Sequence, residues 1–260
     1  MLTTPLFARS PSVVIGENYS YTFSSDFVQL EVDIAVSASE ESAVSMQLWA
    51  SPAPFQGGLL QGVKVAEVSC GTLTADTHIS ECAPAYVPAG HASHFMVLVL
   101  VASPVNEQDL IIDYANFAQP QAFIVPRMNG KVVVDVQGDA ADITIEQIEN
   151  PRIATNLSGT LALELWSLSE PYQGASFNGV QQGSVIVGTL LGQTSWSNKV
   201  IHMQLATPIG DNLVLMLREW TGSGYITRDY YTVEQKRYDK KLNIFHALFC
   251  SASGLCSGKP

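Results

Sequence analysis

The stretch Val44-Ser-Met-Gln-Leu-Trp49 returns 117 positions later as Leu161-Ala-Leu-Glu-Leu-Trp166. In both stretches apolar residues recur at every second position, a pattern that is typical of a half-buried β-strand. The same shift places Pro54-Phe-Gln-Gly57 on Pro171-Tyr-Gln-Gly174, and further blocks follow in the same register. One register kept across separated blocks predicts that the chain contains two copies of a single module.

The rest of each copy also has the pattern of β structure. Phe27–Val36 alternates apolar and polar residues, and the apolar runs Val97–Val101 and Leu213–Leu217 are typical of strands at the centre of a sandwich. Clusters of Ser, Pro and Gly separate these runs. The pattern predicts an all-β chain of two tandem immunoglobulin-like antiparallel β-sandwiches. Trp49 and Trp166 are expected in the core between the two sheets.

The repeat also predicts the domain organisation. We expect module 1 over residues 13–125 and module 2 over residues 130–235, joined near Pro126-Arg-Met-Asn-Gly130, where Pro and Gly suit a linker. Residues 1–12 and 236–260 are expected to form short N- and C-terminal extensions.

The composition excludes several classes of protein. The 260 residues include 13 basic and 24 acidic ones, for a net charge of −11, and 47% are hydrophobic. This apolar content excludes a disordered chain, and the deficit of Lys and Arg argues against nucleic acid as a partner. No apolar run approaches the roughly 20 residues of a membrane helix. Residues 10–126 hold Lys64 as their only base against twelve acidic residues, so module 1 is strongly acidic.

The C-terminal extension combines a basic cluster with an apolar stretch. Its expected assembly residues are four bases and two phenylalanines: Lys236, Arg237, Lys240, Lys241, Phe245 and Phe249. Sheet edges carry unpaired backbone groups that an extended segment can pair with. We expect the extension either to join a neighbouring copy, with its bases near the acidic module 1, or to fold back on its own module.

The four cysteines form two close pairs, Cys70 with Cys82 and Cys250 with Cys256. The first pair flanks an expected hairpin and the second would close a tight loop, so we expect two disulfides, with free thiols as the alternative. Neither spacing matches a zinc knuckle. Disulfides indicate an extracellular or cell-surface location. The N-terminus shows no signal-peptide pattern, which leaves a virion surface protein as a further alternative.

The second copy carries Leu161-x-Leu-Glu-Leu-Trp-x4-Pro-Tyr-x-Gly and Gly222-Ser-Gly-Tyr-Ile-Thr-Arg-Asp-Tyr230. With these residues it resembles an uncharacterised repeat module of bacterial exported proteins. The resemblance implies a bacterial, extracytoplasmic β-sandwich and supplies no catalytic residues. It is weaker in the first copy, where Ile111-Ile-Asp-Tyr114 lacks the Gly-Ser-Gly turn and the Arg.

Motifs for catalysis are absent from the sequence. There is no nucleophile elbow, no His-Glu-x-x-His and no phosphate-binding loop. Asp229 lies beside Arg228 and could serve as a catalytic acid. The first copy also has an aspartate at the equivalent strand position, Asp113, so we expect Asp229 to form a structural hydrogen bond or salt bridge.

Metal-binding patterns are equally sparse. His91 and His94 are interpreted as solvated loop residues, and no metal site is expected. Asp139 and Asp142 lack the regular spacing of a calcium loop, so no cofactor is expected, with Ca²⁺ as the remaining alternative.

Three functions remain. The favoured one is a non-enzymatic extracellular or surface structural subunit that associates with itself or with another surface protein. The second is a carbohydrate- or ligand-binding module that uses loop aromatics, namely Tyr172, Trp196, Trp220 and Tyr225. An exposed, coplanar aromatic row would favour this function, and a buried row would argue against it. The third is a hydrolase with unrecognised catalytic residues.

Overall fold

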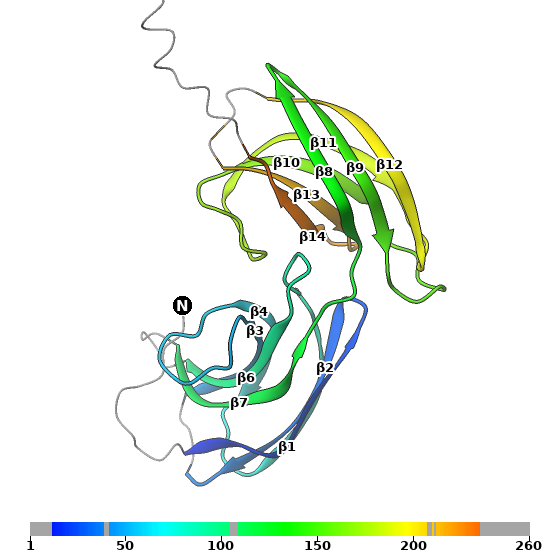
Figure 1. Cartoon of the computed structure of the whole chain (residues 1–260). Helices are drawn as coiled ribbons and strands as arrows, with labels where there is room; N and C mark the ends of the chain where they lie inside the picture. The colour runs from blue at the N-terminus through cyan, green and yellow to red at the C-terminus, as the bar shows by residue number, and fades with distance from the viewer. Residues whose placement is uncertain (1–11, 39–41, 104–108, 207–209, 211, 235–260) are drawn as a thin grey trace, which may run out of the picture.

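A computed structural model describes residues 12–38, 42–103, 109–206, 210 and 212–234 (Figure 1). Within these ranges the protein consists of strands joined by turns and loops, and the prediction of an all-β chain is confirmed. The described residues include no helix long and apolar enough to cross a membrane. The fourteen strands are β1 (Val13–Ser24), β2 (Phe27–Val36), β3 (Ala43–Ser51), β4 (Val63–Gly71), β5 (Thr77–Pro84), β6 (His94–Ser103), β7 (Leu110–Gln121), β8 (Arg127–Gln137), β9 (Ala140–Asn150), β10 (Leu161–Leu168), β11 (Gly179–Gly188), β12 (Thr194–Gln204), β13 (Asn212–Trp220) and β14 (Tyr225–Thr232).

The strands form two modules with the same topology. In module 1 the sheets have the orders β1-β2-β5 and β4-β3-β6-β7. In module 2 the orders are β8-β9-β12 and β11-β10-β13-β14, which repeat those of module 1 seven strands later. All pairings are antiparallel. The two tandem immunoglobulin-like sandwiches predicted from the repeat are therefore present (Figure 1).

The pairing register repeats as well as the strand order. Trp49 lies opposite Val97 on β6 and Lys64 on β4. Trp166 lies opposite the residues 117 positions further on, Val214 and Gln181. The strand pairs β3–β4 and β10–β11 also shift register at the same place, immediately before the tryptophan. The two copies therefore share backbone geometry as well as sequence pattern.

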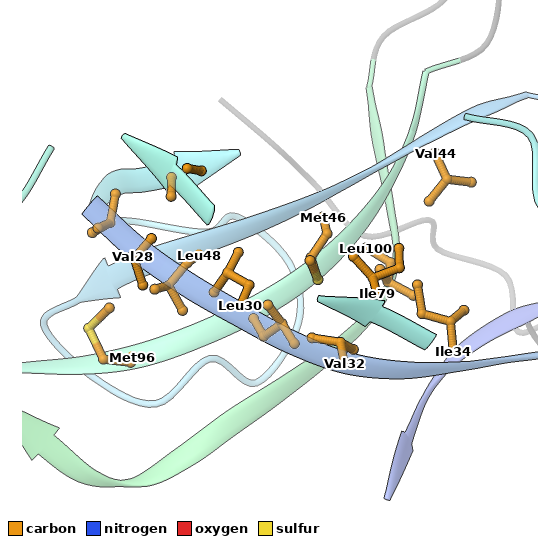
Figure 2. Close-up of a cluster of buried hydrophobic side chains, with 14 of the residues drawn as sticks. Val28, Leu30, Val32, Ile34, Val44, Met46, Leu48, Ile79, Met96 and Leu100 are labelled. Atoms are coloured by element: carbon orange, nitrogen blue, oxygen red, sulfur yellow. The ribbon is translucent and has the colours of Figure 1, made fainter. Parts of the chain in front are cut away.

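Each sandwich encloses an apolar core between its sheets. On β2 the alternate residues Val28, Leu30, Val32 and Ile34 are buried and face β3 and β6 of the other sheet (Figure 2). In module 2 the corresponding core includes Ile143 and Ile145 of β9 and the leucines of β10 and β13. Burial of these alternating side chains explains why the strand period was readable from the sequence.

The prediction that Trp49 and Trp166 lie between the sheets is wrong. Met46 and Leu48 of β3 point into the inter-sheet core, so Trp49, which follows Leu48, points to the outer face of the four-stranded sheet. There it packs with a second apolar layer that includes Phe55 from the loop after β3. Trp166 has the equivalent place on β10.

The predicted disulfide between Cys70 and Cys82 is also wrong, because both are free cysteines. They do not flank a hairpin, since the chain crosses from one sheet to the other between β4 and β5. Cys70 packs against the inter-sheet core, whereas Cys82 lies on the exposed face of β5. The second pair, Cys250 and Cys256, lies outside the described residues, as do the expected assembly residues from Lys236 to Phe249.

The two described thiols are expected to differ in reactivity. Burial raises the pKa of Cys70 to about 11, so at pH 8 it carries little of the reactive thiolate. In a Cys250→Ser, Cys256→Ser chain, Ellman's reagent should react with one thiol, Cys82, in the native protein. The second should react only after denaturation. Absence of both thiols in denatured, unreduced protein would contradict the free-cysteine assignment.

Candidate functional site at the junction of the two modules

The two modules meet through loops at one end of each sandwich. Module 1 contributes the β1–β2 turn and the β5–β6 loop, which extends toward module 2 in Figure 1. Ala89 donates its backbone N–H to the carbonyl of Gly174 at 3.0 Å, and Gly90 donates to the carbonyl of Arg228 at 3.0 Å. Gly90 has a φ of 97°, and a Cβ there would lie 3.1 Å from the Tyr230 ring. Glycine thus permits this close approach.

An apolar cluster accompanies these backbone contacts. Ala89 of module 1 packs with Leu168, Tyr172 and Met216 on the outer face of the four-stranded sheet of module 2. The Tyr172 ring meets the Tyr230 ring edge-on, with centroids 4.7 Å apart. The outer face of module 2 is therefore covered partly by its own loop and partly by module 1.

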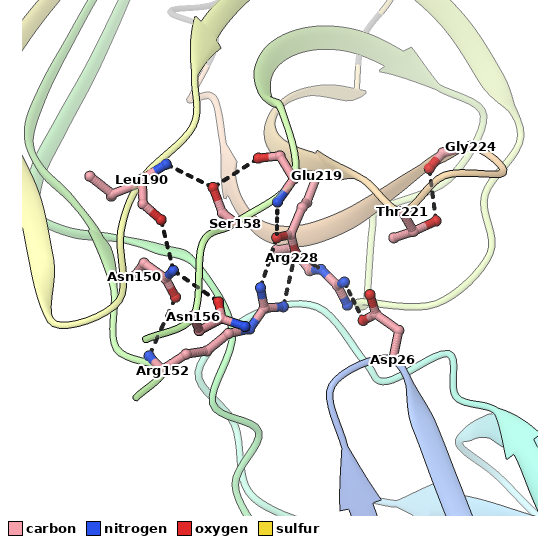
Figure 3. A network of polar contacts seen from close by, with 11 residues as sticks. Asp26, Asn150, Arg152, Asn156, Ser158, Leu190, Glu219, Thr221, Gly224 and Arg228 are labelled. Carbon is pink, nitrogen blue, oxygen red and sulfur yellow. Dashed lines mark hydrogen bonds and ion pairs between the residues drawn. The ribbon is translucent and has the colours of Figure 1, made fainter. Parts of the chain in front are cut away.

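A buried ion-pair network extends across the same junction (Figure 3). The Arg228 side chain is only 1% exposed. Its Nε donates to Glu219 Oε2 at 2.6 Å within module 2, and its Nη2 donates to Asp26 Oδ1 in the β1–β2 turn of module 1. One buried guanidinium thus joins the two modules.

Glu219 is the centre of this network. Arg152 donates to both carboxylate oxygens, at 2.7 and 2.9 Å, and the Gly159 N–H donates to Oε1 at 2.9 Å. Burial opposes ionisation of Glu219, but the Arg152 hydrogen bonds, the charges of Arg228 and Arg152 and the Gly159 N–H outweigh it. The pKa of Glu219 therefore lies below its ordinary value of 4.5.

The loop that carries Arg152 is itself held by buried polar groups. Asn150 donates to the Leu190 carbonyl at 2.9 Å, and the Ser158 hydroxyl accepts from the Leu190 N–H at 2.8 Å (Figure 3). These contacts position Arg152 and Gly159 around the carboxylate. Module 2 thus supplies most of the network, and module 1 contributes Asp26.

Asp229 has the structural role that was expected from its counterpart. Its carboxylate accepts the Met128 N–H of β8 at 2.7 Å and the Tyr230 N–H at 2.9 Å. In module 1, Asp113 accepts the Ile15 N–H of β1 at 2.7 Å. Each aspartate therefore attaches the first strand of its module to the last. Asp229 has an additional partner in His91 of module 1, 2.9 Å away.

The junction charges were missed by sequence reasoning, although the repeat contained a signal for them. Aligning the copies places Arg218 on Val101, Glu219 on Ala102, and Arg228 on Ile112. Charged residues in module 2 thus replace apolar ones at positions that the strand pattern marks as buried. A charge at such a position needs a partner, so these substitutions indicate a specialised surface.

A cleft of about 670 Å³ opens beside the junction, with walls from both modules. Trp49, Lys64 and Tyr86 line it from module 1. Its module 2 wall includes Tyr172, Phe177, Arg218 and Tyr225. A smaller hollow of about 420 Å³ lies within the 169–178 loop. The larger cleft has the size typical of small-molecule sites, roughly 300–1,000 Å³.

The four aromatic residues expected to stack on a ligand do not form one coplanar row. Tyr172 is 8% exposed, and burial raises its pKa to about 12. Tyr225 lines the cleft, and Trp220 meets it at 65° between ring planes. Trp196 lies on β12 in the other sheet, with the Lys199 ammonium 4.8 Å from its ring centroid. The structure therefore brings Tyr172 and Tyr225 to the cleft, with Trp220 beside Tyr225, and places Trp196 elsewhere.

The described residues contain no group of three or more His, Cys, Asp or Glu side chains suited to a metal ion. His91 pairs with Asp229, and burial lowers the pKa of His94. Asp142 pairs with His202 at 2.8 Å.

Comparisons with known proteins do not show a family. No family model matches the chain, and no curated protein matches it. Among solved structures, the chain is similar to a β-glucuronidase of Ruminococcus gnavus at 13% identity (51% of this chain, 18% of that one, TM-score 0.23). It is also similar to the BSP domain of a biofilm-associated protein at 12% identity (87% and 30%, TM-score 0.23). A putative β-galactosidase of Bacteroides fragilis matches at 13% identity (82% and 33%, TM-score 0.27). The chain spans a third or less of each of these proteins.

Proposed function

We propose that this protein is a non-enzymatic structural subunit of an extracellular or surface assembly, in which copies associate with one another. The observation that carries the proposal is the use of ionisable side chains at the junction. Arg228, Glu219, Arg152 and Asp229 all hold backbone or partner side chains in place. Charged side chains of the kind that could carry out acid–base chemistry therefore serve to join the two sandwiches.

Such a junction suits a component that transmits position or force. Interfaces between domains usually permit relative motion unless they are extensive and apolar. Here a buried guanidinium, an apolar cluster and backbone hydrogen bonds all connect the modules. These contacts favour a fixed arrangement of the two sandwiches, which suits a repeating unit.

The charge distribution supports association between copies. Residues 10–126 carry one base and twelve acidic residues, and Lys236–Lys241 carries four bases. A basic segment of one copy is attracted to the acidic module of another, and this attraction weakens as salt screens it. A head-to-tail contact of this kind repeats without closing and produces a filament.

Light scattering of the full chain at increasing concentration tests the proposal. We expect the mass to rise above the 28.1 kDa of one chain, and to rise less at high salt. Deleting residues 242–260, or changing Lys236, Arg237, Lys240 and Lys241 to Glu, should leave a monomer. Deleting residues 1–8 is the matched control and should leave the association unchanged. A full chain that stays monomeric at millimolar concentration would overturn the proposal.

A second function, ligand binding, is favoured by one separate observation. The walls of the cleft beside the junction carry aromatic side chains from both modules, of which Tyr86 of module 1 is exposed and Tyr225 of module 2 is half-buried.

A further inference from the structure

Two tyrosine rings that line the cleft beside the junction are accessible to solvent, the exposed Tyr86 of module 1 and the half-buried Tyr225 of module 2. Tyr86 of module 1 is 56% exposed, and its backbone is held by a 2.8 Å hydrogen bond from its N–H to the Val65 carbonyl. Tyr225 of module 2 lies at the start of β14 and is braced by the Trp220 ring. The held backbone of Tyr86 and the braced ring of Tyr225 reduce the conformational freedom that is lost when a ligand binds.

The cations of the cleft are already neutralised by neighbouring carboxylates. Lys64 Nζ lies 2.5 Å from Glu67 Oε2. Arg218 donates to Glu164 Oε2 at 2.9 Å and to the Tyr225 carbonyl. Its guanidinium also lies over the Trp166 and Phe177 rings, 5.8 Å from each centroid. Each of the two cations of the cleft therefore has a carboxylate partner, which weakens the attraction of an anionic ligand.

The cleft nevertheless retains groups that can form hydrogen bonds. The phenol hydroxyls of Tyr86 and Tyr225 have no hydrogen-bond partner within the part of the chain that the structure describes. Each can donate and accept. Aromatic faces beside neutral hydrogen-bonding groups match a ligand with apolar C–H faces and a rim of hydroxyls.

We propose that this cleft binds a neutral oligosaccharide, with pyranose rings placed between Tyr86 of module 1 and Tyr225 of module 2. Stacking on the two rings supplies contact area, and the phenol hydroxyls pair with sugar hydroxyls. A cleft of about 670 Å³ that is open to solvent accommodates several rings of a chain. This inference rests on the second function proposed above and names its ligand class, and it holds even if the chain proves to be monomeric.

Titration calorimetry with the full chain tests the inference, with cellohexaose, xylohexaose, mannohexaose and chitohexaose as neutral probes and hexagalacturonate as the acidic one. We expect at least one neutral probe to bind. Tyr86→Ala and Tyr225→Ala should each weaken that binding about tenfold, the loss typical of one aromatic contact. Val200→Ala, an exposed position on β12 away from the cleft, is the matched control and should leave binding unchanged.

Circular dichroism and thermal unfolding of each variant establish that the fold is retained. As a second readout, a bound probe should shift the NMR signal of the Trp49 indole N–H, because Trp49 lines the cleft. Binding of none of the neutral hexasaccharides would overturn the inference. So would a preference for hexagalacturonate, or neutral binding that is equally strong in Tyr86→Ala and Tyr225→Ala.

Discussion

Glu219→Ala is expected to lower the free energy of unfolding by about 3–5 kcal/mol, the loss found when one partner of a buried ion pair is removed. Glu219 receives hydrogen bonds from Arg152, Arg228 and the Gly159 N–H. Removing the carboxylate leaves the Arg228 guanidinium buried with Asp26 as its remaining partner. Urea denaturation, followed by tryptophan fluorescence, measures the change.

Two further variants make this result specific to the buried network. Asp142→Ala breaks the exposed pair with His202 and should change stability by at most about 1 kcal/mol. The double variant Glu219→Ala, Arg228→Ile has at both positions the residue types that module 1 has at the aligned positions, Ala102 and Ile112. The double variant should regain part of the loss, because it no longer buries an arginine that lacks Glu219. If Glu219→Ala costs no more than Asp142→Ala, the network does not hold the junction.

Leu98→Ala and Leu215→Ala are each expected to cost about 2–5 kcal/mol, because both remove buried methyl groups and leave a cavity. The two leucines are equivalent in the repeat and are 0% exposed between the sheets of module 1 and module 2 respectively. Thermal unfolding should show which module each change weakens.

The matched control for the leucine variants is Val200→Ala, at a position that is 74% exposed. It should change stability by no more than roughly 0.5 kcal/mol. A small effect at Leu98 and a large one at Leu215 would contradict the equivalence of the two cores.

Local periodicity determined the class of fold and the number of modules. A strand buries every second side chain, so β2 and β3 could be read from a dozen neighbouring residues. The shared register of Trp49 and Trp166 followed from the repeat, because equal spacing of apolar residues imposes equal pairing.

The same periodicity does not say which face of a strand meets the other sheet. Both faces of β6 are apolar, with Leu98 in the inter-sheet core and Val97 in the outer layer. Trp49 was therefore placed on the wrong side. The Cys70–Cys82 pairing was wrong for a related reason, because nearness in sequence does not reveal that the chain changes sheets between β4 and β5.

The sequence by itself determined two β-sandwiches and a structural role for Asp229, because strand period and internal repetition are local properties that one chain displays directly. Only the tertiary structure decided the junction and its cleft. Asp26 and Arg228 are 202 positions apart, and Tyr86 and Tyr225 belong to different modules. Their meeting depends on how one folded module docks on the other, and that arrangement leaves no periodic trace in the sequence.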